Sequence, residues 1–397
     1  MRVLFIAPYL PSKIRVRTYE LLRRLAPRHR LHLIALSGVG EQPAAELAGM
    51  PDVTVEPIPL SLPRALANCA RAAFTGRSLW ASYGRLAGLE AAVRQALSRE
   101  TYDIVHVEHI RAAYAMDSVP AAGPPVVFDG VDCITALFEQ YWRGPAAREA
   151  GLPRRLLYRS EWERMRRYEP AVTRRARATL VTSAWDRDRL IALGADGSRV
   201  HVVRNGVDLT RFRPGPEAEE DIVVFSGKMS FFNNADAARY FHREIWPTVR
   251  RRRPGAKWLV VGAEPPPDLQ ALARRRDVEV TGYVEDLPAA LRRARVAVCP
   301  LRVAVGVQNK LLEAMAVGLP VVATSAACRA LEVKDGEELL IADSPDAFAY
   351  SVQMLLENVD RRREIGRRGR AYVEAHHEWD QSIAALEQVY EDVRAEK

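Results

Sequence analysis

The chain has 397 residues, of which 48% are hydrophobic and 27% charged, a composition typical of soluble globular proteins. Four scattered cysteines without a CxxC pair argue against a disulfide framework or a zinc site and favour a reducing cytosol. No apolar stretch approaches the roughly 18–20 residues of a membrane span, and Met1 leads into an apolar strand with no signal peptide before it. We therefore expect a cytoplasmic protein of two domains, whose contact with a membrane is at most peripheral.

The net charge of +8 is concentrated in the first half of the sequence. Residues 1–200 hold 29 basic and 20 acidic residues, whereas residues 201–397 hold 29 and 30. A genome that favours arginine codons explains why Lys13 is the only lysine among the first 200 residues, but it does not explain the asymmetry. An anionic partner (a membrane surface, a lipid phosphate or a nucleic acid) would explain it, and both interpretations stay open.

Short apolar runs alternate with helical stretches along the chain. Several runs are continuous in Val, Ile and Leu, which is typical of strands covered on both faces and hence of parallel sheets. The strands predicted in the first half are Val3–Ala7, Leu31–Leu36, Val53–Ile58, Asp103–Val107, Val126–Asp129 and Thr179–Thr182. Those predicted in the second half are Ile222–Ser226, Lys257–Gly262, Val278–Thr281, Val296–Pro300, Val321–Thr324 and Leu339–Ala342.

Helices are expected between these strands, among them Arg17–Ala26, the arginine-rich stretch 154–177 and an amphipathic helix over Trp379–Val393. Turn-forming residues at 211–216 and an acidic run after them place a boundary within 204–220. Two β/α series in tandem predict an α/β protein of two doubly wound domains.

The strongest ligand signal is the stretch 306–324, which has the pattern of a loop, a helix, a glycine stop and a buried strand. Gly318 suits a left-handed helix end, and Gly306 lets the backbone approach a ligand closely. Lys310 and Glu313 lie three apart near the helix start. Free amides there, together with Lys310, suit a diphosphate, and Glu313 can accept hydrogen bonds from ribose hydroxyls. A solvated Lys310–Glu313 ion pair is the alternative.

Two further junctions of the second half carry weaker signals. Gly227 opens the backbone after a strand, and Lys228 can bind a phosphate as a point charge, although a simple turn is the alternative. The loop that contains Tyr283 and Val284 offers backbone groups to a base edge, and Asp286 is predicted to cap the next helix.

Polar side chains also follow the carboxyl ends of strands in the first half, where open parallel sheets bind their ligands. They are Lys13, Arg15 and Arg17 after the first strand, His106, Glu108 and His109 at the fourth, and Asp129 and Asp132 at the fifth. These groups can bind an acceptor or move a proton, and structural hydrogen bonds are the alternative for each of them.

Several function classes lack their motifs. No GxGxxG follows the first strand, and there is no Walker A lysine loop and no GxSxG elbow. The second half has no DxD carboxylate pair at a strand end, so we expect no metal site. No nucleic-acid reading module is recognisable, so a nucleic-acid-binding protein, which the charge alone suggests, ranks last among the function hypotheses, and we expect no nucleic-acid partner.

The segment from Gln308 through Glu313 and Gly318 to Thr324 resembles the donor-site signature of family 4 retaining glycosyltransferases of the GT-B fold. The segment 203–212, Gly227-Lys228, the 281–287 loop and the final helix from Trp379 fit the same family in order. Pro8-Tyr9, Val107-Glu108-His109 and the segment 128–132 are most similar to its exopolysaccharide-associated sugar transferase subgroup.

This resemblance implies an α/β GT-B fold of two facing Rossmann-like doubly wound domains, with a C-terminal helix that crosses back to the first. The implied domains are an acceptor domain over 1–203, a nucleotide-sugar donor domain over 204–375 and the C-terminal helix over 376–397. It also implies transfer with retention of configuration from a UDP- or GDP-linked sugar, with no cofactor and no metal.

The resemblance implies roles for single residues as well. Glu313 matches the glutamate that binds the donor ribose, Lys228 stands where the family has an arginine facing the diphosphate, and His109 matches a histidine beside the donor sugar and acceptor; these three are the implied catalytic residues. The other implied donor-binding residues are Gly227, Tyr283, Val284, Gly306, Val307, Gln308, Asn309 and Lys310. The implied acceptor-side residues are Lys13, Arg15, Arg17, His109 and Asp129.

The sequence departs from the family pattern at several positions. The glutamate that the family pairs with Glu313 falls at Val305, a second phosphate-binding lysine after Gly227 is replaced in a region that holds Asn233 and Asn234, and a glycine-rich loop is replaced by Pro11–Arg17. A catalytically degenerate GT-B protein that binds a sugar or a partner is therefore the alternative function.

Family 4 acceptors are often lipid-linked. Residues 64–99 hold six arginines against one acid, and residues 143–177 hold eleven against four. Such basic surfaces can rest on anionic lipid, which makes a lipid-linked or oligosaccharide acceptor and an anionic membrane surface the expected partners beside the nucleotide sugar. A solvated helix face is the alternative.

Overall fold

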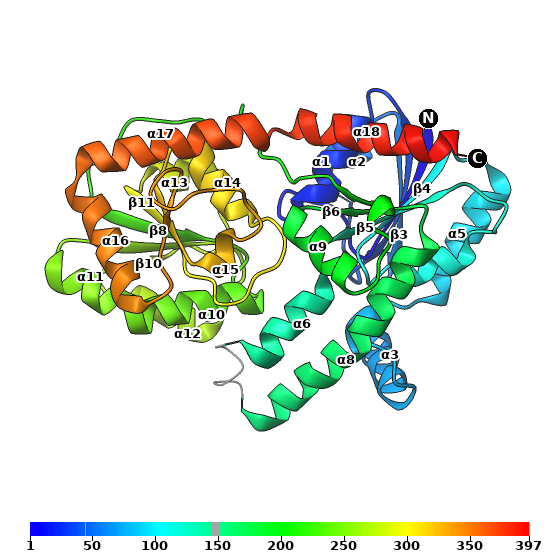
Figure 1. Cartoon of the computed structure of the whole chain (residues 1–397), viewed down its shortest axis with the longest axis horizontal. Helices are drawn as coiled ribbons and strands as arrows, with labels where there is room; N and C mark the ends of the chain where they lie inside the picture. Colours follow the sequence, from blue (N-terminus) through cyan, green and yellow to red (C-terminus); the bar gives the residue numbers. More distant parts are fainter. Residues whose placement is uncertain (44, 145–150, 397) are drawn as a thin grey trace. The chain divides into compact units, whose positions relative to one another are not determined.

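The computed structural model describes residues 1–43, 45–144 and 151–396 of the chain. By their contacts the residues form two compact units, of which one contains Met1–Arg204 and Ser382–Lys397 and the other contains Asn205–Gln381. Each unit has a parallel sheet of its own with helices packed around it (Figure 1). The arginine-rich stretch 143–177 includes residues 145–150, which lie outside the described residues.

The first unit contains a seven-stranded sheet in the order β3-β2-β1-β4-β5-β6-β7, and every pairing is parallel. Its strands are β1 (Arg2–Ala7), β2 (Arg30–Ser37), β3 (Val53–Pro59), β4 (Ile104–Glu108), β5 (Val126–Val131), β6 (Ala178–Val181) and β7 (Val200–Val202). The direction of winding reverses between β1 and β4. At such a switch point the loops after two neighbouring strands separate, and their carboxyl ends become accessible to a ligand.

Helices cover the faces of this sheet, as its buried apolar strands require. They are α1 (Val16–Leu25), α2 (Ala45–Ala48), α3 (Leu62–Phe74), α4 (Leu79–Ser82), α5 (Ala87–Arg99), α6 (Ile134–Arg143), α8 (Leu152–Arg175), α9 (Ala184–Ala192) and, from Ser382 onward, α18 (Trp379–Ala395). Short 3₁₀ turns lie at Ala113–Ser118 and Gly197–Arg199.

The second unit contains a six-stranded sheet in the order β10-β9-β8-β11-β12-β13, again parallel throughout. Its strands are β8 (Ile222–Ser226), β9 (Lys257–Val261), β10 (Val278–Val280), β11 (Val296–Cys299), β12 (Val321–Ala323) and β13 (Leu340–Ile341). Its helices are α10 (Phe232–Tyr240), α11 (Trp246–Arg252), α12 (Pro267–Ala271), α13 (Leu287–Arg292), α14 (Asn309–Ala316), α15 (Ser325–Cys328), α16 (Pro345–Glu357) and α17 (Val359–His376), with a π-helical turn at Phe241–Ile245. The switch point lies between β8 and β11.

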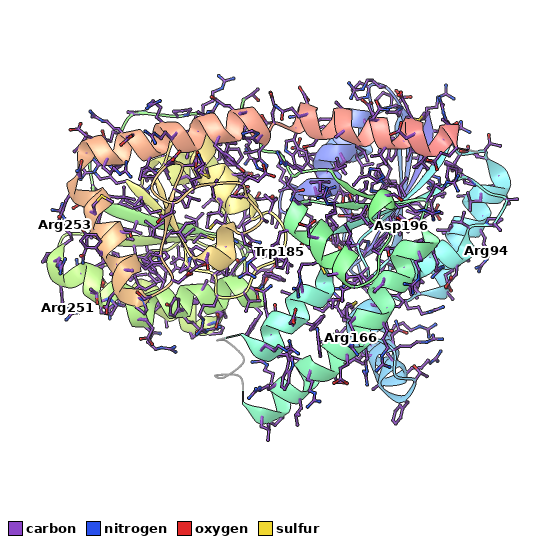
Figure 2. The ribbon with its side chains drawn as sticks, in the orientation of Figure 1. Arg94, Arg166, Trp185, Asp196, Arg251 and Arg253 are labelled. Carbon is purple, nitrogen blue, oxygen red and sulfur yellow. The ribbon has the colours of Figure 1, made fainter. Side chains whose placement is uncertain are left out.

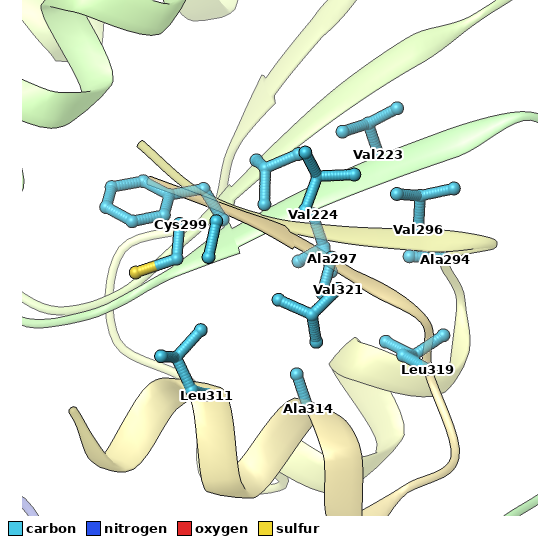
Figure 3. Packing of buried hydrophobic residues seen from close by; sticks show 14 of the residues in the cluster. Val223, Val224, Ala294, Val296, Ala297, Cys299, Leu311, Ala314, Leu319 and Val321 are labelled. Carbon is cyan, nitrogen blue, oxygen red and sulfur yellow. The ribbon is translucent and has the colours of Figure 1, made fainter. Parts of the chain in front are cut away.

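Helix α14 shows how the core of the second unit positions a polar edge. Leu311, Leu312 and Met315 are at most 1% exposed and form the buried stripe that the sequence predicts. Leu311 points toward the strands near Cys299 of β11, and Ala314 points toward Val321 of β12 (Figure 3). Because this face is fixed against the sheet, the residues on the other side of the helix are held at the carboxyl end of β11.

The predicted strands are all present, with ends that differ by at most two residues. Strand β7 was not predicted, because it has only three residues and His201 interrupts its apolar pattern. Helix α18 buries Ile383, Leu386 and Tyr390 on one face, as the amphipathic pattern indicates.

Candidate functional site

Two glycines let the loops after β8 and β9 come together at the switch point of the second unit. Gly227 and Gly262 have φ angles of 151° and 149°, which residues with a side chain rarely adopt. A Cβ on Gly262 would lie 1.8 Å from the carbonyl oxygen of Gly227. A Cβ on Gly227 would lie 2.8 Å from Nδ2 of Asn234 and 3.1 Å from Cε of Lys310. The backbone of Gly227 and the side chain of Lys310 are therefore brought together, as the two separate sequence signals require.

Side-chain amides hold Lys310 at this edge. Its Nζ donates to Oδ1 of Asn234 at 2.9 Å and to Oε1 of Gln308 at 3.4 Å. Asn234 in turn donates from Nδ2 to the carbonyl oxygen of Lys228 at 2.9 Å. In the described ranges no carboxylate forms an ion pair with Lys310, and burial lowers the pKa of its ammonium, against the opposing effects of Cys299 and Glu313. A partly buried cation with neutral partners is suited to bind an anion.

Glu313 lies one turn further along α14, partly buried. Within the part of the chain that the structure describes, its carboxylate has no hydrogen-bond or ion-pair partner. Burial raises the pKa of Glu313 to about 7, although the positive charges of Lys310 and Arg211 oppose the shift. The alternative of a solvated Lys310–Glu313 ion pair is wrong, because both side chains are partly buried and Lys310 binds Asn234 instead.

The loop before α14 has the expected glycine turn but an apolar interior. Gly306 has a φ of 61°, and Gly318 ends the helix with a φ of 81°, as predicted. Val305 and Val307 are 8% and 7% exposed. Gln308 does not cap the helix with its side chain; its Nε2 donates to the carbonyl oxygen of Val305 at 2.9 Å. Within the described residues, no side chain caps the backbone N–H groups in the first turn of α14.

Lys228 is placed differently from Lys310. Its ammonium forms an ion pair with Glu264 at 3.2 Å, and its side chain is 36% exposed. Glu264 has a φ of 54°, a strained value for a residue with a side chain, and also accepts a hydrogen bond from Ser230 Oγ at 2.7 Å. An anion that binds Lys228 must therefore compete with a carboxylate.

The remaining donor residues lie around the same edge. Tyr283 is 59% exposed in the loop after β10, and Val284 is half-buried beside it. The N–H of Gly262 donates to the carbonyl oxygen of Gly282 at 3.0 Å, which ties this loop to the one after β9. Asp286 caps α13 by accepting from the N–H of Ala289, as predicted.

Asn309 is half-buried at the first position of α14. Its Oδ1 accepts from Nδ2 of Asn205 at 3.2 Å.

In the first unit, His109 follows β4 in a strained conformation with a φ of 64°. Its N–H donates to the carbonyl oxygen of Asp129 at 2.6 Å, and its Nδ1 accepts from the N–H of Arg111 at 3.2 Å. Burial and the charge of Arg111 lower the pKa of His109 to about 3. The ring is therefore neutral at pH 7, and its proton lies on Nε2, which is a hydrogen-bond donor.

Arg17 and Asp129, expected on the acceptor side, bind each other in the interior. Nε of Arg17 lies 2.8 Å from Oδ2 of Asp129, and the side chains are 5% and 0% exposed. Burial raises the pKa of Asp129, but the opposing effects of Arg17 and His106 are larger and lower this pKa to about 2. Nδ1 of His106 forms a hydrogen bond with the hydroxyl of Tyr390 on α18, at 2.7 Å.

The three cations of the Pro11–Arg17 segment differ in exposure. Lys13 is exposed, Arg15 is half-buried over the ring of Tyr9, and Arg17 is buried.

Two further carboxyl groups at this edge have raised pKa values. Oε1 of Glu108 accepts from the hydroxyl of Tyr9 at 2.8 Å across the β1–β4 switch point, and burial raises the pKa of Glu108 to about 7. Burial and the charge of Asp186 raise the pKa of Asp132 to about 8. Val131, which lies between Asp129 and Asp132 in the sequence, has a φ of 65°, an outlier for a β-branched residue.

Sequence reasoning missed Tyr390 and Glu264 as neighbours of the predicted site residues and did not assign Asn234 the role of holding Lys310. No pattern in the sequence indicates these contacts, since they join residues far apart in the chain. Among the described residues, no group of three His, Cys, Asp or Glu side chains converges as metal ligands would. None of the described helices is both long and apolar enough to cross a membrane.

Two family models match the chain. The model described as Glycosyltransferase Family 4 matches residues 14–211, and the model described as Glycosyl transferases group 1 matches residues 220–358. Together they take in most of the sequence. The chain belongs to glycosyltransferase family 4. The relationship predicted from the donor-site signature is confirmed, and the roles of single residues stay predictions.

Curated members of this family match part of the chain. The D-inositol 3-phosphate glycosyltransferase of Acidothermus cellulolyticus is 28% identical over an alignment of 246 residues, and the match covers 55% of this chain and 54% of that protein. The GDP-mannose-dependent alpha-(1-6)-phosphatidylinositol monomannoside mannosyltransferase of Mycobacterium tuberculosis is 29% identical over an alignment of 230 residues, and the match covers 51% of this chain and 59% of that protein. The chain spans somewhat more than half the length of these relatives.

Solved structures of similar fold match this chain over nearly its whole length. Anabaena HepE in complex with UDP-glucose has a TM-score of 0.70 at 15% identity, with 100% of both chains covered. Sucrose-phosphate synthase from Thermosynechococcus elongatus has the same TM-score, identity and coverage. WaaG, a glycosyltransferase involved in lipopolysaccharide biosynthesis, has a TM-score of 0.67 at 16% identity, with 98% of this chain and 99% of that one covered. The GT-B fold predicted for this chain is thus confirmed.

Proposed function

We propose that this chain is a hexosyltransferase that moves a sugar from a UDP- or GDP-linked donor to a saccharide acceptor with retention of configuration. Its place would be polysaccharide or glycoconjugate biosynthesis. The observation that carries the proposal is the pair formed by Lys310, whose partners are neutral, and Glu313, whose carboxylate has no partner in the described residues. Partly buried charges left in this state cost stability, and a ligand that binds both of them explains why they are retained.

The spacing of the two groups fits the two ends of a nucleoside diphosphate. Lys310 and the uncapped amides of α14 offer donors to phosphate oxygens, and Glu313 offers acceptors to ribose hydroxyls. Lys228 would join the phosphate site after giving up Glu264. The exposed ring of Tyr283 and the backbone beside Val284 would lie along the base.

The proposed chemistry is electrostatic. As the bond between the sugar and the diphosphate breaks, negative charge grows on the leaving oxygen, and fixed cations and amides stabilise that charge more than they stabilise the bound donor. Lysines and backbone amides supply the positive charge, so the proposal needs neither a metal ion nor another cofactor. His109, neutral with its proton on Nε2, would donate a hydrogen bond to a sugar or acceptor hydroxyl.

The acceptor we propose is a lipid-linked or other oligosaccharide, reached at the anionic inner face of a membrane. The basic excess of the first half supports this part of the proposal. A relative is named for its action on a phosphatidylinositol mannoside, and a structural neighbour for its part in lipopolysaccharide biosynthesis. Lys13 and Arg15 remain the acceptor-side cations, with the buried Arg17–Asp129 pair holding the backbone of His109.

Val305 favours a second candidate, a GT-B protein that binds a nucleotide sugar without turnover. The family's paired glutamate is absent there, and the valine is buried in an apolar loop. The contact to the sugar would then depend on the backbone amides at 306–308 alone.

Donor turnover separates the two candidates. We would supply UDP-glucose, UDP-galactose and GDP-mannose, with and without an oligosaccharide acceptor, and measure the release of UDP or GDP. The proposal expects release by the wild type with at least one donor and a loss of roughly 100-fold or more in Glu313→Ala. Glu357→Ala, an exposed acid on α16, is the matched control and should act like the wild type. Nucleotide binding without any release would favour the second candidate.

A further inference from the structure

Helix α3 (Leu62–Phe74) presents large apolar side chains to solvent. Only Ala65 and Ala72 of its 13 residues are buried. Leu62 and Leu66 are 62% and 58% exposed, and Phe74 is 93% exposed. The helix is therefore packed by its small residues and exposes its large ones, the reverse of an ordinary surface helix.

The exposed apolar residues form one row. Leu62, Leu66, Ala70 and Phe74 follow one another at intervals of four, so they lie along the same side of the helix. The buried Ala65 and Ala72 lie roughly a third of a turn or more around the helix from the middle of this row. In Figure 2 the side chains of α3 project into open space beside α8, on which Arg166 is labelled. A contiguous apolar row of this kind marks an interaction surface.

Arginines accompany the row. From residue 57 to residue 89 the sequence has four arginines and no aspartate or glutamate. These four, Arg64, Arg71, Arg77 and Arg85, line a cavity of about 350 Å³ behind α3, whose one acidic residue is Glu90. Glu90 lies 3.4 Å from Arg85. In the described ranges, the side chains of Arg64 and Arg71 have no hydrogen-bond or ion-pair partner.

A second cavity of about 380 Å³ continues the basic wall. It shares Arg77 and Arg85 with the first and adds Arg164, Arg167 and Arg175 of α8. Its acidic residue, Asp117, is already paired with Arg175. The surplus of guanidinium groups over carboxylates therefore extends from α3 to α8, and it favours an anionic partner.

We propose that α3 and the arginine-lined cavity behind it form a docking surface for an anionic phospholipid bilayer. The apolar row would enter the boundary between headgroups and acyl chains, while the arginines bind headgroup phosphates. A nucleic acid would use the arginines but would leave the apolar row without a role. The inference rests on the membrane part of the proposed function and names the surface that carries it.

Vesicle binding of the full chain tests this surface. Wild type and variants would be floated with vesicles of phosphatidylcholine alone and of phosphatidylcholine with phosphatidylglycerol. We expect the wild type to bind only the anionic vesicles, and less at high salt. Each arginine near an anionic surface strengthens binding about fivefold, so the variant with both Arg64→Glu and Arg71→Glu should lose roughly 25-fold or more. The variant with both Leu66→Ser and Phe74→Ser should lose roughly tenfold.

Matched controls lie on the second unit. Arg274→Glu with Arg276→Glu changes the net charge equally at exposed positions, and Tyr350→Ser removes another exposed aromatic ring, 62% exposed. Both controls should bind as the wild type does. Thermal unfolding and UDP or GDP titration verify that each variant is folded with its donor site intact, so a failure of donor turnover leaves this test unaffected.

Three outcomes would overturn the proposal. The α3 variants could bind anionic vesicles as well as the wild type, or the wild type could bind neutral and anionic vesicles equally. Alternatively, sedimentation could reveal a dimer that the Leu66→Ser and Phe74→Ser changes dissociate, in which case a second copy of the chain covers this face.

Discussion

The switch points of the two sheets carry charged side chains in different states. Near the β1–β4 switch of the first unit, polar groups bind one another: Arg17 forms an ion pair with Asp129, and the hydroxyl of Tyr9 donates to Glu108. At the β8–β11 switch of the second unit, Lys310 has neutral partners and Glu313 has none in the described residues. The first edge is thus largely paired within the protein, although Oε2 of Glu108 has no hydrogen-bond partner in the described residues, and the second edge is incomplete.

This difference separates two uses of buried polar groups. Paired polar groups fix geometry, here the strained backbone of His109, whose N–H donates to the carbonyl oxygen of Asp129. An unsatisfied group costs stability until a ligand completes it, and such costs are expected at binding sites. The comparison therefore predicts that mutations at the first edge act mainly on stability and mutations at the second act mainly on nucleotide affinity.

The largest effect is expected for Asp129→Asn. It leaves the Arg17 guanidinium buried without its counter-charge, which costs about 3–5 kcal/mol of unfolding free energy. Urea unfolding at pH 7 measures this loss, with the exposed Glu357→Gln as control. The pKa of Asp129 is about 2, below its ordinary value, so its contribution is present above pH 4 and is lost as the pH falls toward 2. A loss below 1 kcal/mol would contradict the first half of the comparison.

The next effect distinguishes the two lysines of the second edge. Lys310→Met should weaken UDP or GDP binding roughly 10- to 100-fold, since a charged hydrogen bond contributes about 1.5–3 kcal/mol. Lys228→Met should weaken it less than tenfold, because Glu264 already neutralises that ammonium. Calorimetric titration measures both, and Lys334→Met, exposed on the same unit, is the control. The reverse order of the two effects would show that the diphosphate binds at Lys228 instead.

A smaller effect concerns the pH dependence of stability. The pKa of Glu313 is raised to about 7 in the folded protein. The stability that its protonated form contributes is therefore fully present below its ordinary pKa and is lost as the pH rises through 7. Glu313→Gln removes this loss and should be more stable than the wild type at pH 8 by on the order of 1–3 kcal/mol, with equal stability near pH 4.

Glu108→Gln is the matched comparison for that variant, because burial raises the pKa of Glu108 to about 7 as well. Both variants should gain stability at pH 8, but only Glu313→Gln should weaken nucleotide binding. If Glu108→Gln weakens it equally, the two edges do not differ as proposed.

The smallest effect is expected for Tyr390→Phe, which removes the hydroxyl 2.7 Å from Nδ1 of His106. One lost hydrogen bond in the interior costs about 1 kcal/mol of unfolding free energy. Urea unfolding at pH 7 measures it, and UDP or GDP affinity should not change. An altered affinity would mean that the C-terminal helix influences the donor site.

Local sequence patterns were sufficient to predict most of the fold. Continuous apolar runs identify strands that are buried on both faces, and the Leu311/Met315 stripe with Gly318 defines α14. Strand β7 was missed because the run Val200–Val202 is too short to distinguish from a loop. Such patterns report local periodicity, so they predict helices and strands more reliably than the contacts between them.

The candidate site was predicted less completely, because its charges are paired over long distances in the sequence. Arg17 and Asp129 are 112 positions apart, Lys310 and Asn234 are 76 apart, and His106 and Tyr390 are 284 apart. The sequence places each residue at a strand end but does not indicate which of them are buried together. It therefore grouped Arg17 with Lys13 as similar cations, although one is buried and the other exposed.

The most direct test of the central claim is a calorimetric titration of the folded protein with UDP and with GDP, comparing the wild type with the variant that has both Lys310→Met and Glu313→Ala. We expect the wild type to bind one of the two nucleotides and the double variant to lose roughly 100-fold or more of this affinity while keeping its stability. Equal affinity in the two proteins would contradict it, because the β8–β11 edge would then not be the donor site.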